Sequence, residues 1–284
     1  MAKKTAPKKV KVAKTAAQTG KKTASKKITM GGLHRWNVGL GVLHALQGIA
    51  IILLASANKL PITTNYLTND TLAAQAAGHV VLVPATRHLF DVNLAYLVAA
   101  FFFMSAFAHF FIATRYRKTY EADLKKGINK ARWIEYGISA STMMVAIALL
   151  SGVYDISNLG MIFGLILVMD LMGLVMEIHN QTTKKTSWLS YKIGCLAGIV
   201  PWVVIAIYVK GTIVYGDSRI PTFVYWIYAS MLILFSSFAV NMYLQYKKTG
   251  KWADYLYCER GYMILSLVAK TLLAWQIFFG TLRP

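Results

Sequence analysis

Seven long apolar runs constrain the fold of this chain more than any other feature of its sequence. A bilayer core about 30 Å thick needs roughly 20 consecutive apolar residues in an α-helix. Backbone groups inside lipid must find hydrogen-bond partners within their own segment, so runs of this length are predicted to be helices. The sequence therefore predicts an all-α membrane protein with seven transmembrane helices. The runs cover approximately residues 38–57, 89–114, 133–154, 156–177, 191–209, 221–243 and 261–282.

The overall composition agrees with this prediction. Hydrophobic residues make up 56% of the chain and charged residues 15%, whereas soluble domains have about 45–50% and about 25%. A net charge of +20 would by itself suit a nucleic-acid-binding protein, but the charges lie almost entirely outside the apolar runs. The chain has 2 cysteines, too few for a disulfide scaffold or a cysteine-based metal centre. We therefore expect a membrane protein without a metal site.

Basic residues are distributed unevenly between the two sides of the predicted membrane. If the runs cross in turn, the N-terminal tail and the second, fourth and sixth loops share one side. Twenty-five of the 31 Lys and Arg residues lie on that side, five lie on the other, and Lys270 lies inside the last run. Because Lys and Arg favour the cytoplasmic face, we expect a cytoplasmic N-terminus, an extracellular C-terminus and a location in the cell membrane.

Residues 1–29 form a segment rich in Lys, Ala and Thr that contains no acidic residue. Such a composition buries too little apolar surface to fold, which predicts a disordered cytoplasmic tail before a single membrane domain at 30–284. Lysines near an anionic lipid surface contribute on the order of 1 kcal/mol each. Contact with anionic lipid and a role limited to fixing the topology are both open, and binding to nucleic acid or an acidic protein is a third alternative.

The first loop on the predicted extracellular side, residues 58–88, is unusually long. Its alternating stretch at 79–83, just before Pro84, is typical of a β-strand. Loops of this length usually have structure of their own. We expect a small extracellular β-structure or a dimer contact here.

Lys270 is an ionisable residue near the middle of the last apolar run. Such residues are costly in a bilayer and mark functional sites by default. A buried amine can be accommodated in two ways: by an ion pair with a carboxylate that serves a structural role, or by covalent modification. A desolvated lysine is nucleophilic toward aldehydes and forms Schiff bases. Both solutions stay open on the residue pattern alone.

Glu135, early in the third run, is the expected partner of Lys270. A protonated Schiff base in a low dielectric needs a nearby anion, and a carboxylate provides one. Helix directions place several further polar side chains in the same cytoplasmic half of the membrane, although the sequence does not establish that they converge. These side chains are His44, Ser105, His109 and Ser266.

Two more acids lie in the fourth run. Asp170 is either a protonated structural residue, which we favour, or a group facing a crevice or a neighbouring subunit. Glu177 lies near the cytoplasmic end of the run and is expected to be solvated.

Several local motifs resemble those of heliorhodopsins, which are retinal-binding membrane photoreceptors with an inverted topology. The resemblance covers about residues 34–283 and excludes the basic tail. An inside N-terminus fits this family and opposes the usual microbial rhodopsin orientation. The matching motifs are Arg-Trp-Ile-Glu-Tyr at 132–136, Gly-Cys-Leu-Ala-Gly-Ile-Val-Pro-Trp at 194–202, Tyr-Leu-Gln-Tyr-Lys at 243–247, Leu-Ser-Leu-Val-Ala-Lys at 265–270 and Ala-Trp-Gln-Ile-Phe at 274–278.

The resemblance implies a seven-helix rhodopsin-like bundle that binds all-trans retinal as a protonated Schiff base on Lys270, with Glu135 as the counterion. It also implies a homodimer to which the first extracellular loop contributes. By the same resemblance, the polar network around the Schiff base comprises His44, Gln47, Ser105, His109, Asn129 and Ser266. The residues implied to line the polyene and ring are Tyr136, Met143, Met169, Gly173, Trp202 and Phe235. Ordinary helix packing is the alternative for each apolar residue among them.

The resemblance further implies a light sensor in which retinal isomerises from all-trans to 13-cis and a cytoplasmic partner, not identified by the sequence, receives the signal. A light-gated proton channel or transporter is an alternative function, in which Asp170 could extend a proton path. A retinal-free transporter or receptor is a third class. The sequence contains no nucleophile–base–orienter set, so we do not expect an enzyme.

Overall fold

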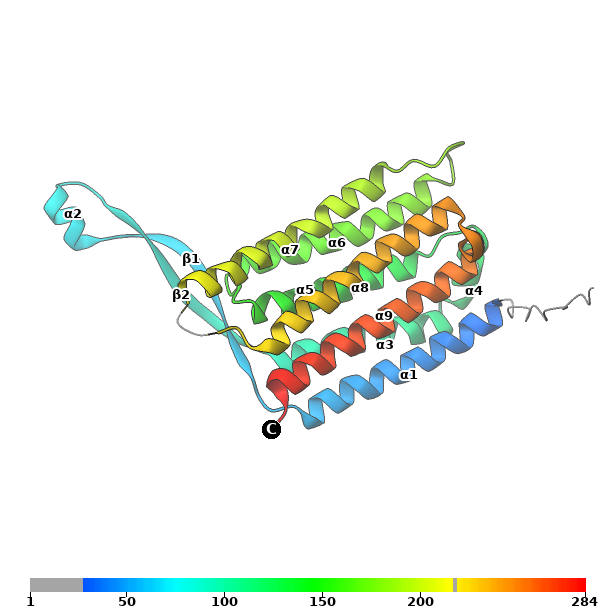
Figure 1. Cartoon of the computed structure of the whole chain (residues 1–284), viewed down its shortest axis with the longest axis horizontal. Helices are drawn as coiled ribbons and strands as arrows, with labels where there is room; N and C mark the ends of the chain where they lie inside the picture. Colours follow the sequence, from blue (N-terminus) through cyan, green and yellow to red (C-terminus); the bar gives the residue numbers. More distant parts are fainter. Residues whose placement is uncertain (1–27, 217–218) are drawn as a thin grey trace, which may run out of the picture.

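The computed structural model describes residues 28–216 and 219–284, so most of the lysine-rich tail predicted at 1–29 lies outside the described residues. Seven of the described helices are long and apolar enough to cross a membrane, as the sequence predicts. They run side by side as a bundle (Figure 1). These helices are α1 (Met30–Leu54), α3 (Leu94–Ala113), α5 (Lys130–Leu150), α6 (Ile156–His179), α7 (Leu189–Tyr215), α8 (Thr222–Lys247) and α9 (Tyr255–Ile277), which continues as a π-helical turn η2 (Phe278–Leu282).

Several helices begin outside the apolar runs that predicted them, because polar capping residues and not hydropathy set their first turns. Asn129 caps α5 by accepting a hydrogen bond from the Arg132 backbone, and Asp155 caps α6 in the same way. Thr29 and Asp254 cap α1 and α9. Side chains of these types satisfy the backbone N–H groups that the first helical turn leaves free. As a result α1 and α9 begin about two turns earlier than the hydropathy pattern indicates.

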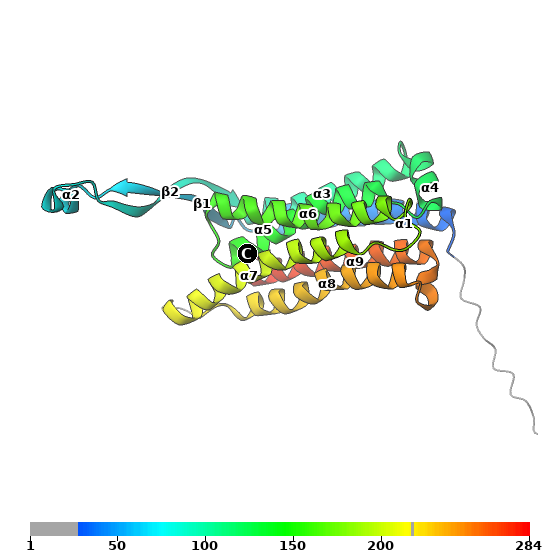
Figure 2. The same ribbon diagram turned by 90° about the horizontal axis from the view of Figure 1, so that it is seen from above.

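Neighbouring helices in the bundle follow the chain order. α1 packs on α3, α3 on α5, α5 on α6, α6 on α7 and α8 on α9, while α9 returns to contact α1 and α3. Seen from above, α8 and α9 lie in one layer and α3 and α6 in the other (Figure 2). A short amphipathic helix, α4 (Arg117–Lys125), and the 3₁₀ turn η1 (Gly250–Ala253) lie at the end where α1 begins. We call this end the α4 end.

At the opposite end, an antiparallel β-hairpin projects away from the bundle (Figure 1). We call this end the hairpin end. Its strands are β1 (Lys59–Asn69) and β2 (Leu82–Asn93), and the short helix α2 (Thr71–Ala77) joins them. The hairpin confirms the predicted β-structure of this loop. The strand predicted at 79–83 instead begins at Leu82 and runs through Pro84, which is tolerated because a two-stranded ribbon has only edge strands. Residues 89–93 complete β2, so α3 starts later than predicted.

The hairpin is bonded to the bundle at two places, the middle of β1 and the segment just before it. The backbone N–H of Asn65 donates to Asp155 Oδ2 at 3.0 Å, next to the start of α6. The Ser56 hydroxyl donates to the carbonyl oxygen of Leu282 at 2.8 Å, and Asn58 Nδ2 donates to Thr281 Oγ1 at 2.6 Å. The hairpin is therefore attached to both α6 and the end of α9.

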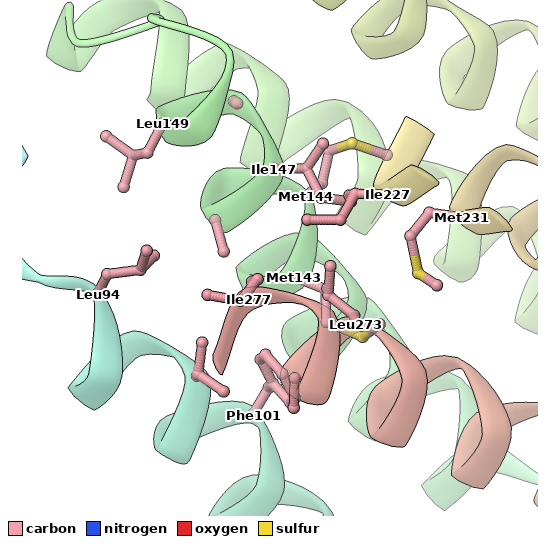
Figure 3. Close-up of a cluster of buried hydrophobic side chains, with 14 of the residues drawn as sticks. Leu94, Phe101, Met143, Met144, Ile147, Leu149, Ile227, Met231, Leu273 and Ile277 are labelled. Atoms are coloured by element: carbon pink, nitrogen blue, oxygen red, sulfur yellow. The ribbon is translucent and has the colours of Figure 1, made fainter. Parts of the chain in front are cut away.

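The largest apolar core lies in the half of the bundle near the hairpin. Side chains from α3, α5, α8 and α9 converge there, including Leu94, Ile147, Ile227 and Leu273 (Figure 3). In lipid, such helices gain stability from close van der Waals packing and little from the hydrophobic effect. This packed half positions α5 and α9, which carry the main polar residues of the other half.

Candidate functional site

Lys270 of α9 is buried in the bundle and has two polar partners. Its Nζ lies 3.1 Å from Glu135 Oε1 of α5 and donates to Ser266 Oγ at 2.7 Å. Ser266 precedes Lys270 by four residues, which places both side chains on one face of α9. The amine also lies 5.2 Å from the centre of the Tyr136 ring, within the range of a cation–π contact. Each contact stabilises a positive charge at this position.

Glu135 is held by both α3 and α9. Ser105 of α3 donates to Glu135 Oε1 at 2.5 Å, the same oxygen that faces Lys270. The Glu135 side chain is 8% exposed, and that of Lys270 is 3% exposed. Taking two charges out of water is expensive unless they are paired and hydrogen-bonded, as they are here. The structure therefore brings Ser105, Glu135, Ser266 and Lys270 together.

Two histidines stack beside this pair. The rings of His44 and His109 are 5.6 Å apart and nearly parallel, with an interplanar angle of 8°. His109 Nδ1 lies 2.8 Å from Asn37 Oδ1. Both ring nitrogens of His44 are buried without a hydrogen-bond partner among the described residues. A buried polar group without a partner costs about 1–3 kcal/mol, so leaving the His44 ring unpaired is costly for the fold.

Gln47 lies one turn beyond His44, toward the hairpin end. Its Oε1 accepts a hydrogen bond from Trp275 Nε1 at 3.3 Å, so it connects α1 to α9. None of its hydrogen bonds among the described residues reaches Lys270 or Glu135.

A cavity of about 40 Å³ lies next to the Lys270 amine. Its lining is mostly apolar and comes from α5, α6, α8 and α9. Four residues predicted to line a polyene are among its walls, together with Ser266: Tyr136, Met143, Met169 and Phe235. Such apolar cavities with a few convergent polar groups are typical of ligand sites.

A second cavity, of about 70 Å³, lies between α6, α7 and α8. It shares the walls Met169, Asp170, Phe235 and Phe238 with the first cavity, so these side chains separate the two. Gly173 lines it, and a Cβ atom there would come within 2.5 Å of the Trp133 ring. Trp202 packs edge-on against Phe235 with ring centres 5.9 Å apart. The predicted lining residues therefore gather around two adjacent cavities.

A separate buried ionic cluster lies nearer the α4 end, and we call it the Arg132 cluster. Arg132 of α5 forms ion pairs with Glu259 of α9 and with Glu177 of α6, the latter at 2.6 Å. Tyr255 and Trp133 donate to Glu177 at 3.0 Å and 2.7 Å. The cluster ties three helices together without direct hydrogen bonds to Lys270 among the described residues.

The Arg132 cluster corrects two sequence predictions. Glu177 is fully buried and not solvated as expected, because Arg132 and four hydrogen-bond donors replace its water. Asn129 does not join the network around Lys270. Its side chain caps α5 and its Nδ2 donates to Glu259 Oε1 at 2.7 Å.

The sequence analysis did not identify Asn37, Ser139 or Glu259 as site residues. Asn37 orients His109, and buried Ser139 lines the cavity beside Lys270. Glu259 lies at the start of the last apolar run, where a charged residue normally reaches water. The spacing of Glu259 and Lys270, eleven residues and so about three helical turns, was a usable signal that both face the bundle interior.

Comparison with known proteins gives two positive results. The model of the heliorhodopsin family matches residues 33–282. The crystal structure of a light-driven proton pump from Leptosphaeria maculans resembles this structure with a TM-score of 0.54 and 15% sequence identity, covering 89% of this chain and 96% of that chain. At this identity the likeness concerns the fold alone. No curated protein matches the sequence. The chain is therefore a multi-pass membrane protein with a rhodopsin-like fold.

Proposed function

The chain belongs to the heliorhodopsin family, and on that premise we propose that it is a light sensor with retinal bound covalently to Lys270 and Glu135 as the counterion. Membership of a rhodopsin family implies a retinal chromophore. The observation that carries the residue assignment is the buried pair of Lys270 and Glu135, 3.1 Å apart. We propose a Schiff-base linkage because a buried lysine amine is a suitable nucleophile for an aldehyde.

The side chains around Lys270 suit a positive charge on its nitrogen. Glu135 supplies the opposing charge, and the Ser105 hydroxyl holds its carboxylate in place at 2.5 Å. Ser266 offers a second oxygen at 2.7 Å from the Lys270 nitrogen. Such preorganised partners stabilise a charge without further rearrangement.

The lining of the two cavities suits an apolar polyene. Tyr136, Met143 and Phe235 supply aromatic and thioether surfaces, which pack well against conjugated systems. The two cavities share Met169, Phe235 and Phe238 as walls, so a polyene that occupies both would pass between these side chains. Methionine is flexible enough to adjust to such a ligand.

Bound retinal would supply a light-driven change of shape, from all-trans to 13-cis, at the Lys270 nitrogen. The chain's own residues then determine where the proton on that nitrogen goes. Glu135 is the carboxylate beside that nitrogen, at 3.1 Å, and would take the proton. His44 and His109 follow as groups able to share or relay the proton, because their rings stack and both His44 nitrogens lack a hydrogen-bond partner among the described residues.

Signalling is preferred over ion pumping because of where the acids lie. From Thr271 to the C-terminus the chain contains no acidic residue. In the hairpin half, Asp155 is used to cap α6 and to hold β1. A pump needs a relay of proton-binding groups across the whole membrane. A light-gated proton channel or transporter is the second candidate, favoured by Asp170 lining the same cavity as Lys270.

We further propose that the N-terminus faces the cytoplasm of a cell membrane, as the basic residues indicate. The proposal includes a membrane domain at 30–284, preceded by a basic tail that either contacts anionic lipid or only fixes the topology, and a homodimer in which the hairpin participates. A cytoplasmic partner would read the light state at the α4 end.

The test is an absorption spectrum of the purified full chain with all-trans retinal, before and after hydroxylamine in light. We expect a visible band that hydroxylamine bleaches during illumination, because the reagent attacks the Schiff base. Correctly folded protein that stays colourless with retinal would overturn the proposal. For the second candidate, a light-evoked current in voltage-clamped cells that Asp170→Asn abolishes would favour transport over signalling.

A further inference from the structure

Asp170 is a buried acid that neither the counterion pair nor the Arg132 cluster includes. It lies on α6, is 7% exposed and lines the cavity beside Lys270. A Cβ atom added to Gly137 of α5 would lie 3.8 Å from the Cβ atom of Asp170. The close approach of α5 and α6 at this glycine holds Asp170 against the cavity.

The carboxyl group of Asp170 lacks the partners that a buried charge requires. Its Oδ2 is buried without a hydrogen-bond partner among the described residues. Asp170 also forms no ion pair there, whereas Lys270 is occupied by Glu135. An isolated carboxylate in a low dielectric is far more costly than a neutral acid. These surroundings therefore favour the neutral, protonated acid, and Asp170 lines the cavity beside Lys270.

Asp170 lines the first cavity from the side of α6. It also lines the second cavity, whose walls come from α5, α6, α7 and α8 and, among the described residues, include none of α9. A ligand attached to Lys270 that extends through both cavities would pass Asp170 where it leaves the first cavity for the second. Asp170 thus places a polar group beside the distal part of the chain-like ligand.

We propose that Asp170 is a colour-determining residue of the chromophore site, acting as a neutral acid beside the distal polyene. This inference rests on the proposed function. In a protonated retinal Schiff base, excitation moves positive charge away from the nitrogen. A polar group at the distal end stabilises the excited state more than the ground state, because it interacts with the charge where it develops. Asp170 therefore shifts absorption to longer wavelength.

The first test compares visible spectra of full-length variants reconstituted with all-trans retinal. Asp170→Leu keeps the approximate size and removes the polarity, and we expect its band to move to shorter wavelength. Asp170→Asn keeps a polar group and is expected to stay closer to the wild-type position. Val168→Leu is the matched control, because Val168 lies on α6 but points outward with 41% exposure. Coincident wild-type and Asp170→Leu bands would overturn the inference.

The second test detects the acid itself by light-minus-dark infrared difference spectroscopy. We expect a carbonyl band of a protonated carboxylic acid that disappears in Asp170→Asn but persists in Val168→Leu. If the acid band is unchanged in Asp170→Asn, or if only carboxylate bands respond to the substitution, Asp170 is not a neutral acid beside the polyene.

A third measurement needs no retinal. Asp170→Leu is expected to raise the melting temperature of the apoprotein, because the substitution removes an unpartnered buried polar group. A lower melting temperature would assign Asp170 a structural role and contradict the inference. Wild-type protein that forms no pigment would instead overturn the proposed function, and this thermal measurement would still report on Asp170.

Discussion

The two halves of the bundle differ in what they bury. The half near the hairpin has a packed apolar core, which includes Leu94, Ile147 and Leu273 (Figure 3). The half near α4 buries five charged side chains within the same helices. These are Arg132, Glu135, Glu177, Glu259 and Lys270.

The difference indicates that the hairpin half mainly stabilises the fold and that the α4 half mainly carries the functional groups. Buried ion pairs often contribute no more stability than apolar residues of the same size, because desolvation offsets their attraction. Close packing of apolar side chains stabilises the bundle without this desolvation cost. The hairpin half therefore serves as a rigid frame, while the α4 half retains costly charges whose value lies in function and in fixing how three helices meet. Substitutions in the two halves should consequently differ in how they change the absorption spectrum and the free energy of unfolding.

The largest effect is expected from Lys270→Ala. The substitution removes the amine to which we propose retinal is attached, so the purified variant should form no visible pigment with all-trans retinal. An absorption spectrum measures this directly. Lys210→Ala, which removes an exposed lysine of α7, is the matched control and should keep the pigment. A normal visible band in Lys270→Ala would remove Lys270 from the site.

Glu135→Gln should change the colour and keep the fold. Without the carboxylate, the positive charge on the Lys270 nitrogen loses its stabilising partner. The protonated pigment should absorb at longer wavelength, and a larger fraction should be in the unprotonated, near-ultraviolet form at the same pH. Spectra across a pH series measure both effects. Glu121→Gln alters an exposed pair with Arg117 and should change neither. Superimposable spectra of Glu135→Gln and wild type would mean that another group is the counterion.

Arg132→Met should lower the free energy of unfolding by about 3–5 kcal/mol, because it leaves two buried glutamates without their cation. Thermal or denaturant unfolding in detergent measures the loss. The control is Arg117→Met, which breaks an exposed ion pair with Glu121 and should cost less than about 1 kcal/mol. If both variants lost equal stability, the burial of the Arg132 cluster would have no energetic consequence.

The smallest effect is expected from Ile147→Val in the packed half. Removing one methylene from this fully buried side chain should cost about 1 kcal/mol. The visible band should not move, because Ile147 lines neither cavity. Unfolding and absorption measured on the same sample test both points. A spectral shift here without loss of stability would contradict the division between frame and site.

The sequence predicted the features that follow from hydropathy and helix periodicity. These include the seven helices, the β-structured loop and the proximity of Lys270 to Glu135. Helix periodicity predicts the helix face on which a residue lies, and the position of the residue in its apolar run predicts its depth in the membrane. Residues deep in two runs can therefore be placed against each other. Ser266 and Ser105 were placed correctly for the same reason.

Residues near helix ends could not be placed from hydropathy alone. Glu177 and Glu259 lie where side chains normally reach water, and only the tertiary structure reveals that Arg132 and the α4 segment bury them. Tyr120 of α4 donates to Glu259 at 3.2 Å, a contact between residues that are far apart in the sequence. Asn129 was misplaced for a related reason, since its capping role depends on the end of α5 and not on a transmembrane face.

The hydrogen bonds of the hairpin link its position to both α6 and α9. Its β1 strand is bonded to Asp155 at the start of α6, and the segment before β1 is bonded to Thr281 and Leu282 in the turn that continues α9. A change in the angle between α6 and α9 would therefore move the hairpin, whose tip around α2 lies far from the bundle (Figure 1). The position of the hairpin tip is therefore coupled to the orientation of α9, the helix that carries Lys270.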